Sequence, residues 1–428
     1  MKEVIATRHA KSVIRVGLFL LLVILIPGLH ATASGQDAVK LNRITAPVEF
    51  DGVPDEEAWT SASIFPLIMQ KPVYGSQPTE VSEVYIGYDD KFLWVGARLF
   101  MKDPSKILEV SKRRDEDLRG NDAFSVLLDT YNDNENALVF MTAPTGLRTD
   151  YTISNDASGT MGMGGFSAMN YSWNTFWDVR TATDSRGWYV EMRIPFSSLK
   201  FKPDNDLTTM GLIIVRTTGS KNETSTYPAI DPRYGYMATN MPSLAATVEI
   251  EGARPANPVY VSPYAIGGLS YNWKLNDIET EYVMDDPYPQ RKINAGLDVK
   301  YNINSNLTLD LTVNTDFAQV EADDQQVNLT RYSLFFPEKR QFFQERSSLF
   351  DFSLGGFSDN LFYSRNIGIS SGTPVGILGG VRLTGRIGRW DMGFLDMQTA
   401  KHEEIAGENF GVLRMKRQVI NPNSFVAV

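Results

Sequence analysis

The chain has 428 residues, a formal net charge of −10 at pH 7 and no cysteine. The acidic balance, without a basic stripe, argues against nucleic acid as a partner, because the overall field would repel phosphate. The lack of cysteine excludes a disulfide framework, thiolate metal ligands and a cysteine nucleophile. Only His402 of the three histidines lies beyond the first 33 residues, which excludes a histidine-cluster zinc site and leaves any enzyme to depend mainly on carboxylates.

The N-terminus has the features of an export signal. Four basic residues precede the unbroken apolar run Val16–Ile26, and Ala31-Thr32-Ala33 has the small-x-small pattern of a signal-peptidase site. The run is too short to cross a hydrocarbon core, which needs roughly 20 helical residues. We therefore predict that residues 1–33 are a cleaved signal peptide, with a retained anchor as the alternative. No later stretch has the length of a transmembrane helix, so strands are the only means of crossing a membrane.

Short alternating segments separated by turn residues fill residues 40–250. In Val81–Phe100, two alternating runs flank Asp89-Asp90, which predicts a β-hairpin. A second pair of runs flanks the polar segment 132–136, and Trp188–Ile194 alternates in the same way. Several such strands predict an all-β, antiparallel β-sandwich over residues 40–250, ending near the Gly- and Pro-containing segment 251–258.

From residue 259 onward the predicted strands are longer. In Ile293–Tyr301 and Leu307–Val313, apolar residues alternate regularly with polar ones, and Asp298, Lys300 and Asp310 place charges in mid-strand. An outer-membrane β-barrel has this pattern, because its outside meets lipid and its lumen is polar. We therefore predict that residues 259–428 form the first strands of a transmembrane β-barrel.

Residues 315–374 interrupt this series of strands. The segment contains the aromatic run Phe335–Phe343, and a loop of this length inside a compact region is usually functional. We expect it to be ordered and to pack inside or cap the barrel lumen. The seven candidate strands fall short of the even number, at least about 8, of single-chain bacterial barrels. The barrel is therefore expected to be incomplete, and the chain to be an N-terminal fragment of a longer protein.

Three segments in the first region carry a family resemblance. Phe50–Trp59 and Tyr88–Leu99 resemble the opening of a family-9 carbohydrate-binding module, and Ile194–Phe201 is similar to its later strand-and-turn signature. The resemblance implies a jelly-roll-like β-sandwich that binds sugar between aromatic side chains, often with structural calcium.

The downstream region resembles a large family of envelope proteins in which this module precedes a domain of unknown function thought to be a membrane barrel. The segments that carry this second resemblance are Asp316–Asp323, Phe335–Arg340 and Leu361–Gly368.

Four residues are candidates for ligand binding. Sugar recognition needs an aromatic ring against the apolar face of a pyranose and polar groups at its rim. Trp94 and Arg98 share one face of a predicted strand, and Trp173 and Trp177 lie in a predicted loop. The alternative is that these tryptophans fill the sandwich core.

One turn is rich enough in oxygen ligands to be a candidate calcium site. Asp129, Asn132, Asp133 and Asn134 offer the hard ligands that calcium needs, about 6 to 8 in number. Hairpin turns favour the same residue types, so a plain turn is the alternative. Glycosidase chemistry would need two carboxyl groups about 5 to 9.5 Å apart, and the sequence singles out no such pair.

The sequence therefore favours non-catalytic binding of a glycan or envelope polysaccharide by an exported β-sandwich attached to an outer-membrane barrel. We expect the protein in the cell outer membrane, in contact with its lipid, with the sandwich periplasmic or surface-exposed. One alternative is a carboxylate-based glycosidase that hydrolyses O-glycosyl bonds in carbohydrate catabolism. Another is a transport or structural protein in which the sandwich is a plug or a partner platform.

Overall fold

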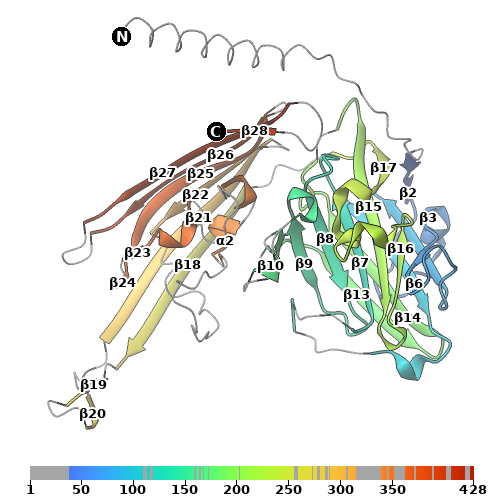
Figure 1. Ribbon diagram of the computed structural model, residues 1–428, viewed down its shortest axis with the longest axis horizontal. Coiled ribbons are helices and arrows are strands. Elements are labelled where there is room, and N and C mark those ends of the chain that lie inside the picture. Colours follow the sequence, from blue (N-terminus) through green and yellow to red (C-terminus); the bar gives the residue numbers. More distant parts are fainter. Residues whose placement is uncertain are drawn as a thin grey trace, which may run out of the picture.

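The computed structural model describes residues 38–428 except 109–112, 116–117, 119, 159–160, 163–164, 167, 172, 202, 255–258, 272, 277–279, 285–287, 289, 305–306, 315–337, 339, 345–346, 351–361, 371–372, 388–389, 402–405 and 420–424. The predicted signal peptide and His402 lie outside these residues. The described chain is all-β, as predicted, and none of its helices is long and apolar enough to cross a membrane. Figure 1 shows two bodies, a sandwich coloured blue to green and a separate sheet coloured yellow to dark red.

The larger sheet of the sandwich has the order β1-β17-β15-β7-β8-β9-β12, with β16 beside β15 and β4 beside β16. Its strands are β1 (Val39–Lys40), β4 (Ile68–Lys71), β7 (Ala123–Asp129), β8 (Ala137–Thr142), β9 (Thr149–Ile153), β12 (Met169–Asn170), β15 (Leu207–Thr218), β16 (Glu223–Tyr227) and β17 (Ala246–Glu251).

The smaller sheet has the order β13-β14-β6-β5-β2, with β3 beside β5. Its strands are β2 (Asn42–Arg43), β3 (Ser63–Ile64), β5 (Ser82–Tyr88), β6 (Phe92–Phe100), β13 (Asp178–Asp184) and β14 (Gly187–Pro195). Strands β5 and β6 pair antiparallel around Asp89-Asp90, which confirms the predicted hairpin.

Short elements complete the described chain. Three strand pairs stand apart from the large sheets: β10 (Met161–Gly162) with β11 (Gly165–Phe166), β19 (Trp273–Leu275) with β20 (Tyr282–Met284), and β23 (Ile369–Ser370) with β24 (Thr373–Pro374). The helices are α2 (Gln341–Gln344) and the 3-10 turns η1 (Glu57–Ser61), η2 (Pro104–Lys106), η3 (Asn155–Ala157), η4 (Gly219–Lys221), η5 (Pro232–Tyr234), η6 (Ala238–Asn240), η7 (Pro242–Leu244), η8 (Ser347–Phe350) and η9 (Ser364–Asn366).

The sandwich buries its apolar side chains between the two sheets. Alternate positions of each strand point to the same face, so every second residue of β5, β6 and β14 meets its counterparts on β7 and β15. The buried set includes Val84, Ile86, Val95, Leu99, Phe124, Val126, Trp188, Val190, Leu212 and Ile214. This core follows from the predicted alternation.

A buried arginine joins the two sheets. Arg216 on β15 is only 1% exposed, and its guanidinium donates to the backbone oxygens of Val81 and Phe100, at 2.7 and 2.6 Å, on the opposite sheet. Burial lowers the pKa of Arg216 to about 10, against the raising effect of nearby acids, so the group stays cationic at neutral pH. The sandwich therefore closes around a hydrogen-bonded charge as well as an apolar core.

The second body is one antiparallel sheet whose strands are paired in chain order. Its order is β18-β21-β22-β25-β26-β27-β28, and within the described residues β18 and β28 remain its two edges, so no closed barrel is formed. The strands are β18 (Val259–Ser270), β21 (Gln290–Asn304), β22 (Leu307–Val313), β25 (Ile377–Ile387), β26 (Trp390–Thr399), β27 (Asn409–Gln418) and β28 (Phe425–Ala427).

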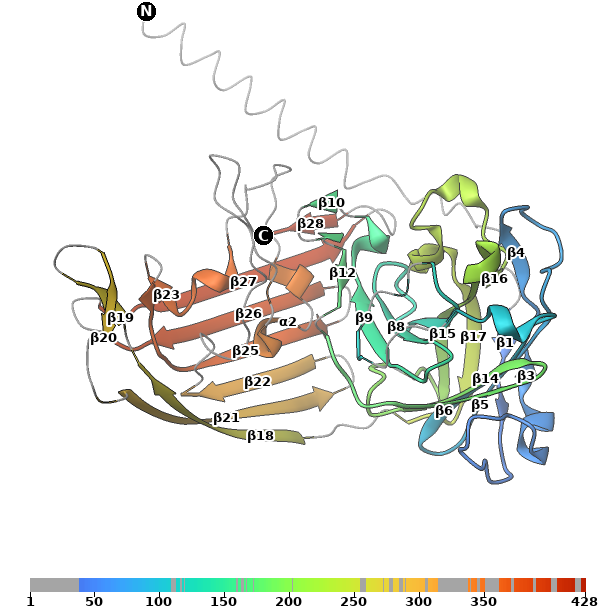
Figure 2. The same cartoon turned by 90° about the horizontal axis from the view of Figure 1, so that it is seen from below.

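The two faces of this sheet differ in polarity. On β22, Thr308, Asp310 and Thr312 are buried, whereas Leu311 is 40% exposed. The covering segment includes α2 (Figure 2). Arg382 of β25 donates both to Asp310, at 3.3 Å, and to the backbone oxygen of Phe342, at 2.8 Å. Within the expected insertion 315–374, residues 315–337 and 351–361 lie outside the described residues. The described part therefore packs on the polar face of the sheet.

Polar contacts join the sandwich to the second sheet. Lys416 of β27 pairs with Glu135 at 3.0 Å, and Arg386 of β25 lies 3.3 Å from Asp133. Lys200 donates to Thr308 at 2.9 Å. The turn after β7 is thus the place where the sandwich meets the ends of the long strands.

A candidate ligand-binding site on the sandwich

Trp94 and Trp177, two of the predicted ligand-binding residues, are buried. Trp94 is 6% exposed, packs against the edges of Phe50 and Phe92, and donates its indole N–H to Asp89 at 2.8 Å. Trp177 is 2% exposed and packs against Phe140. A sugar needs a free ring face on which to stack, so this burial favours the core role given as the alternative.

Arg98 and Trp173 lie in different surroundings. The Arg98 guanidinium donates to the backbone oxygen of Pro54, at 2.6 Å, and to Glu83, at 3.3 Å, so it holds the N-terminal segment against β6. Trp173 is half-buried beside Phe140. Because Trp94 and the two tryptophans near residue 175 belong to separate apolar clusters, the four predicted residues do not form one site.

Glu191 binds the motif Phe50–Trp59 to the smaller sheet of the sandwich. This carboxylate on β14 is fully buried and accepts hydrogen bonds from the backbone N–H groups of Asp51 and Gly52, at 3.0 and 2.8 Å, and from the indole of Trp59, at 3.1 Å. Gly52 has φ +103°, and a Cβ there would lie 2.9 Å from the backbone of Thr181. The glycine and the tryptophan of the motif are therefore needed to dock the segment onto the sheet.

Burial raises the pKa of Glu191 to about 7, because the three hydrogen bonds to the carboxylate do not fully offset the loss of water and the nearby Glu56. The group therefore titrates near neutrality. Its oxygens are already used to hold the N-terminal segment, so its role is structural.

The candidate calcium turn is closed by its own hydrogen bonds. Asp129 is buried and accepts from the backbone N–H groups of Asp133 and Asn134, while Asp133 accepts from those of Glu135 and Asn136 at 2.9 and 2.8 Å. Burial and the neighbouring Asp133 raise the pKa of Asp129 to about 7.

Asn132 and Asn134 adopt the left-handed backbone conformation, which is common in hairpin turns. Among the residues that the structure describes, no group of three or more His, Asp or Glu side chains could hold a metal ion.

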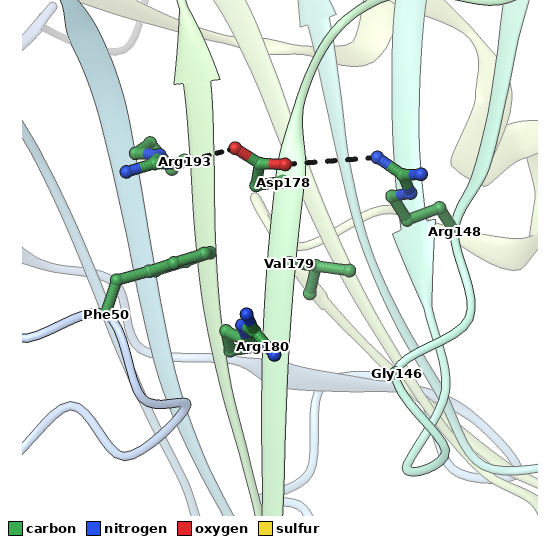
Figure 3. A pocket seen from close by; sticks show the side chains of 7 residues that line it. All are labelled: Phe50, Gly146, Arg148, Asp178, Val179, Arg180 and Arg193. Atoms are coloured by element: carbon green, nitrogen blue, oxygen red, sulfur yellow. Dashed lines mark hydrogen bonds and ion pairs between the residues drawn. The ribbon is translucent and has the colours of Figure 1, made fainter.

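A hollow of about 250 Å³ opens beside the edge strand β13 (Figure 3). Three segments that are distant in sequence line it: Phe50 from the N-terminal motif, Gly146 and Arg148 from the loop before β9, and side chains of β13 and β14. The strand residues are Asp178, Val179, Arg180 and Arg193.

Local geometry brings these segments together. Asp178 and Arg180 are two residues apart on β13, so their side chains share the outer face of the strand. Gly146 has φ +74°, and a Cβ there would lie 2.9 Å from the hydroxyl of Thr181. The glycine therefore lets the loop that carries Arg148 approach the strand closely.

Asp178 is the charged centre of the hollow. Its carboxylate accepts a hydrogen bond of 2.6 Å from the Arg193 guanidinium. The Arg148 guanidinium lies 4.0 Å from the same carboxylate. The Arg193 guanidinium also lies over the rings of Phe50 and Phe92, at 4.8 and 5.1 Å from their centres. Arg193 is thereby held in place, and Figure 3 shows Arg148 and Arg193 on opposite sides of Asp178.

The lining suits hydrogen bonding to a polar ligand. Guanidinium groups supply several N–H donors in fixed directions, and Asp178 supplies acceptors, a combination that matches sugar hydroxyl groups. Among the side chains that line the hollow, Asp178 is the one carboxylate, whereas a glycosidase needs two. Sequence reasoning missed this site because its three segments are far apart in the chain: Phe50 lies about 100 residues before Arg148, and Arg148 lies 30 residues before Asp178.

One family model matches part of the chain. Residues 276–376 match the family model "Domain of unknown function (DUF5916)", and the three downstream motifs lie within this range. No curated protein matches the chain.

Solved structures of carbohydrate-binding proteins are similar to about half of the chain. A family-9 carbohydrate-binding module from Caldicellulosiruptor kristjanssonii in complex with glucose is 19% identical, covers 51% of this chain and 97% of its own, and has a TM-score of 0.34. The module from the same organism in complex with cellotriose is 19% identical over 52% of this chain and 100% of its own, with a TM-score of 0.32. A putative carbohydrate-binding protein from Bacteroides uniformis ATCC 8492 is 11% identical over 50% of this chain and 99% of its own, with a TM-score of 0.39.

Proposed function

We propose that the sandwich binds carbohydrate without catalysis, at the hollow beside β13. The observation that carries the proposal is the convergence of Arg148, Asp178, Arg180 and Arg193 around a cavity of about 250 Å³. Ligand sites are concave and contain a few polar groups that fix the ligand's orientation. Here strands β13 and β14 hold most of those groups, so little conformational entropy is lost when they bind.

The test is calorimetric titration of the purified full-length chain with neutral and acidic oligosaccharides. Glucose and cellotriose, the sugars in the two module structures, serve as neutral probes. Arg193→Gln removes the donor that holds Asp178 and should weaken binding, whereas Arg254→Gln, at an exposed position outside the hollow, should not. The absence of saturable binding to every oligosaccharide would refute the proposal.

We further propose that the seven-stranded sheet attaches the protein to the outer membrane through its exposed face. Cross-strand neighbours continue this face from strand to strand, because Val261 lies opposite Val299, Val299 opposite Leu311 and Leu311 opposite Val381. The exposed apolar side chains of the sheet include Val259, Val261, Leu297, Tyr301, Leu311, Val313, Leu413 and Val426. An apolar face of this extent marks an interaction surface, and the predicted export signal makes lipid the partner that we favour.

Fractionation of cells that express the full gene tests this attachment. We expect the protein in the outer-membrane fraction after an alkaline carbonate wash, which strips peripheral proteins. Release of the intact protein by the wash would contradict the proposal, whatever the outcome of the sugar titrations.

A further inference from the structure

We infer that the hollow beside β13 selects a sugar that carries a carboxylate, that is, a uronic-acid unit of an acidic polysaccharide. The inference rests on the proposed carbohydrate binding and adds the chemical class of the ligand. It depends on the charge balance of the lining, on the position of Arg180 and on the ring of Phe50.

The lining has three guanidinium groups and one carboxylate. Asp178 is shared by Arg193 and Arg148, which leaves Arg180 without a carboxylate partner among the residues that the structure describes. The chain as a whole carries a charge of −10, so this local excess of positive charge runs against the general composition. An anionic ligand would restore the balance within the hollow.

The arginines differ in how they are held. Arg193 is fixed by Asp178 and by two aromatic rings, and Arg148 donates to the backbone oxygen of Trp177 at 2.9 Å. Arg180 is exposed on the same strand, two residues after Asp178, and Figure 3 places it between Phe50 and Val179. A planar guanidinium with free N–H groups pairs with a carboxylate through two parallel hydrogen bonds. Arg180 is therefore the group that meets the ligand's charge.

The remaining lining matches the sugar part of such a ligand. Phe50 is half-buried and forms one wall, and the Arg193 guanidinium covers one face of its ring, so only the exposed part of the ring offers an apolar surface to a pyranose. The oxygens of Asp178 and the N–H groups of Arg148 face the same space and are suited to hydroxyl groups. The combination distinguishes a uronate from a simple inorganic anion, which would use the arginines alone.

The experiment titrates the full-length protein in detergent with trigalacturonate, cellotriose and inorganic sulfate. Trigalacturonate should bind at least about tenfold more tightly than cellotriose, because one charge-assisted pair is worth about 1.5–3 kcal/mol, or a tenfold or larger change in Kd. Arg180→Gln should bring the affinity for trigalacturonate down to the affinity that the same variant has for cellotriose, and Arg254→Gln should change neither affinity. Rising salt should weaken trigalacturonate binding, since Arg180 is exposed and the side chains of Arg148, Asp178 and Arg193 are 34% to 51% exposed.

The outcomes separate the two proposals. Equal affinities for trigalacturonate and cellotriose, or an unchanged preference in Arg180→Gln, would overturn the inference and leave carbohydrate binding standing. Sulfate that binds as tightly as trigalacturonate would overturn the uronate assignment in favour of a plain anion site. If neither oligosaccharide binds to a protein whose thermal unfolding is intact, the proposed function itself fails.

Discussion

Apolar and polar residues alternate along the strands of both bodies of this chain, but the two bodies bury different faces of those strands. In the sandwich, the apolar side of each central strand is buried between two sheets, as Val84 and Leu212 illustrate. On β22 of the seven-stranded sheet, the polar side is covered and the apolar side is exposed, as Asp310 and Leu311 illustrate. Alternation thus indicates that a strand has two faces of different polarity. The elements that pack against the sheet determine which of the two faces is buried.

Both bodies also contain a buried arginine, but its partners differ. Arg216 in the sandwich donates to backbone oxygens of the opposite sheet, whereas Arg382 pairs with Asp310 of the neighbouring strand. Alternation alone would place Asp310 in a water-filled lumen and make a charge change there harmless. The structure corrects this expectation, because Asp310 is 7% exposed and an arginine in its place would lie against Arg382.

The largest effect is expected from the buried charge of the sandwich. Arg216→Met should lower the free energy of unfolding by about 3–5 kcal/mol, because it breaks the hydrogen bonds between the sheets and removes a positive charge that lies near buried acids. Urea unfolding measures the loss, and Arg254→Met at an exposed position is the control. A change of the same size in both variants would mean that Arg216 does not join the sheets.

The next effect distinguishes a lipid-facing sheet from a water-facing one. Leu311→Arg should lower the stability of the membrane-inserted protein by about 2–4 kcal/mol, the range for an arginine at the bilayer midplane. The matched control is Ile64→Arg on β3 of the sandwich, which is exposed to water and should cost less than about 0.5 kcal/mol. Equal, small losses in the two variants would show that the apolar face of the sheet meets water.

The acid Glu191 makes the stability of the sandwich depend on pH. Its pKa rises from 4.5 to about 7 on folding, so between these values the folded protein keeps a proton that the unfolded chain releases. The contribution of Glu191 to the free energy of unfolding should therefore be highest below pH 4.5, fall by about 1–3 kcal/mol as pH rises toward 7, and then level off.

The contribution of Asp129 to the free energy of unfolding should also fall as pH rises, until the pH reaches the pKa of Asp129 at about 7. The share of Glu191 is obtained from Glu191→Gln, in which the pH dependence should be shallower even though the variant is less stable throughout. Parallel pH profiles for the wild type and the variant would contradict the assignment of the titration to Glu191.

The smallest effect concerns the contact between the two bodies. Lys416→Met, Glu135→Gln and the double variant form a cycle whose coupling free energy should be about 1 kcal/mol, as for a partly shielded ion pair. Unfolding of all four proteins under identical conditions gives this coupling. A value of zero would mean that the sandwich and the long strands are not joined through this pair in solution.

The sequence alone determined the regular part of the fold. The run Val81–Phe100 predicted the hairpin of β5 and β6, because period-2 alternation and a turn dipeptide are local properties of the backbone. The pattern of Leu307–Val313 likewise predicted a strand with one apolar and one polar face. The sequence also marked Phe50–Trp59 as a family motif, although its physical purpose became clear only with Glu191 in place.

Tertiary structure decided which of these side chains are available to a ligand. Trp94 and Trp177 suited a sugar site by residue type, but packing between elements distant in sequence covers them. The same packing brings Phe50, Arg148 and Arg180 around one hollow, although nothing local in their three segments relates them. Strand alternation depends on neighbours in the chain, whereas a binding site depends on the order of strands in a sheet and on loop approach, which are set by long-range contacts.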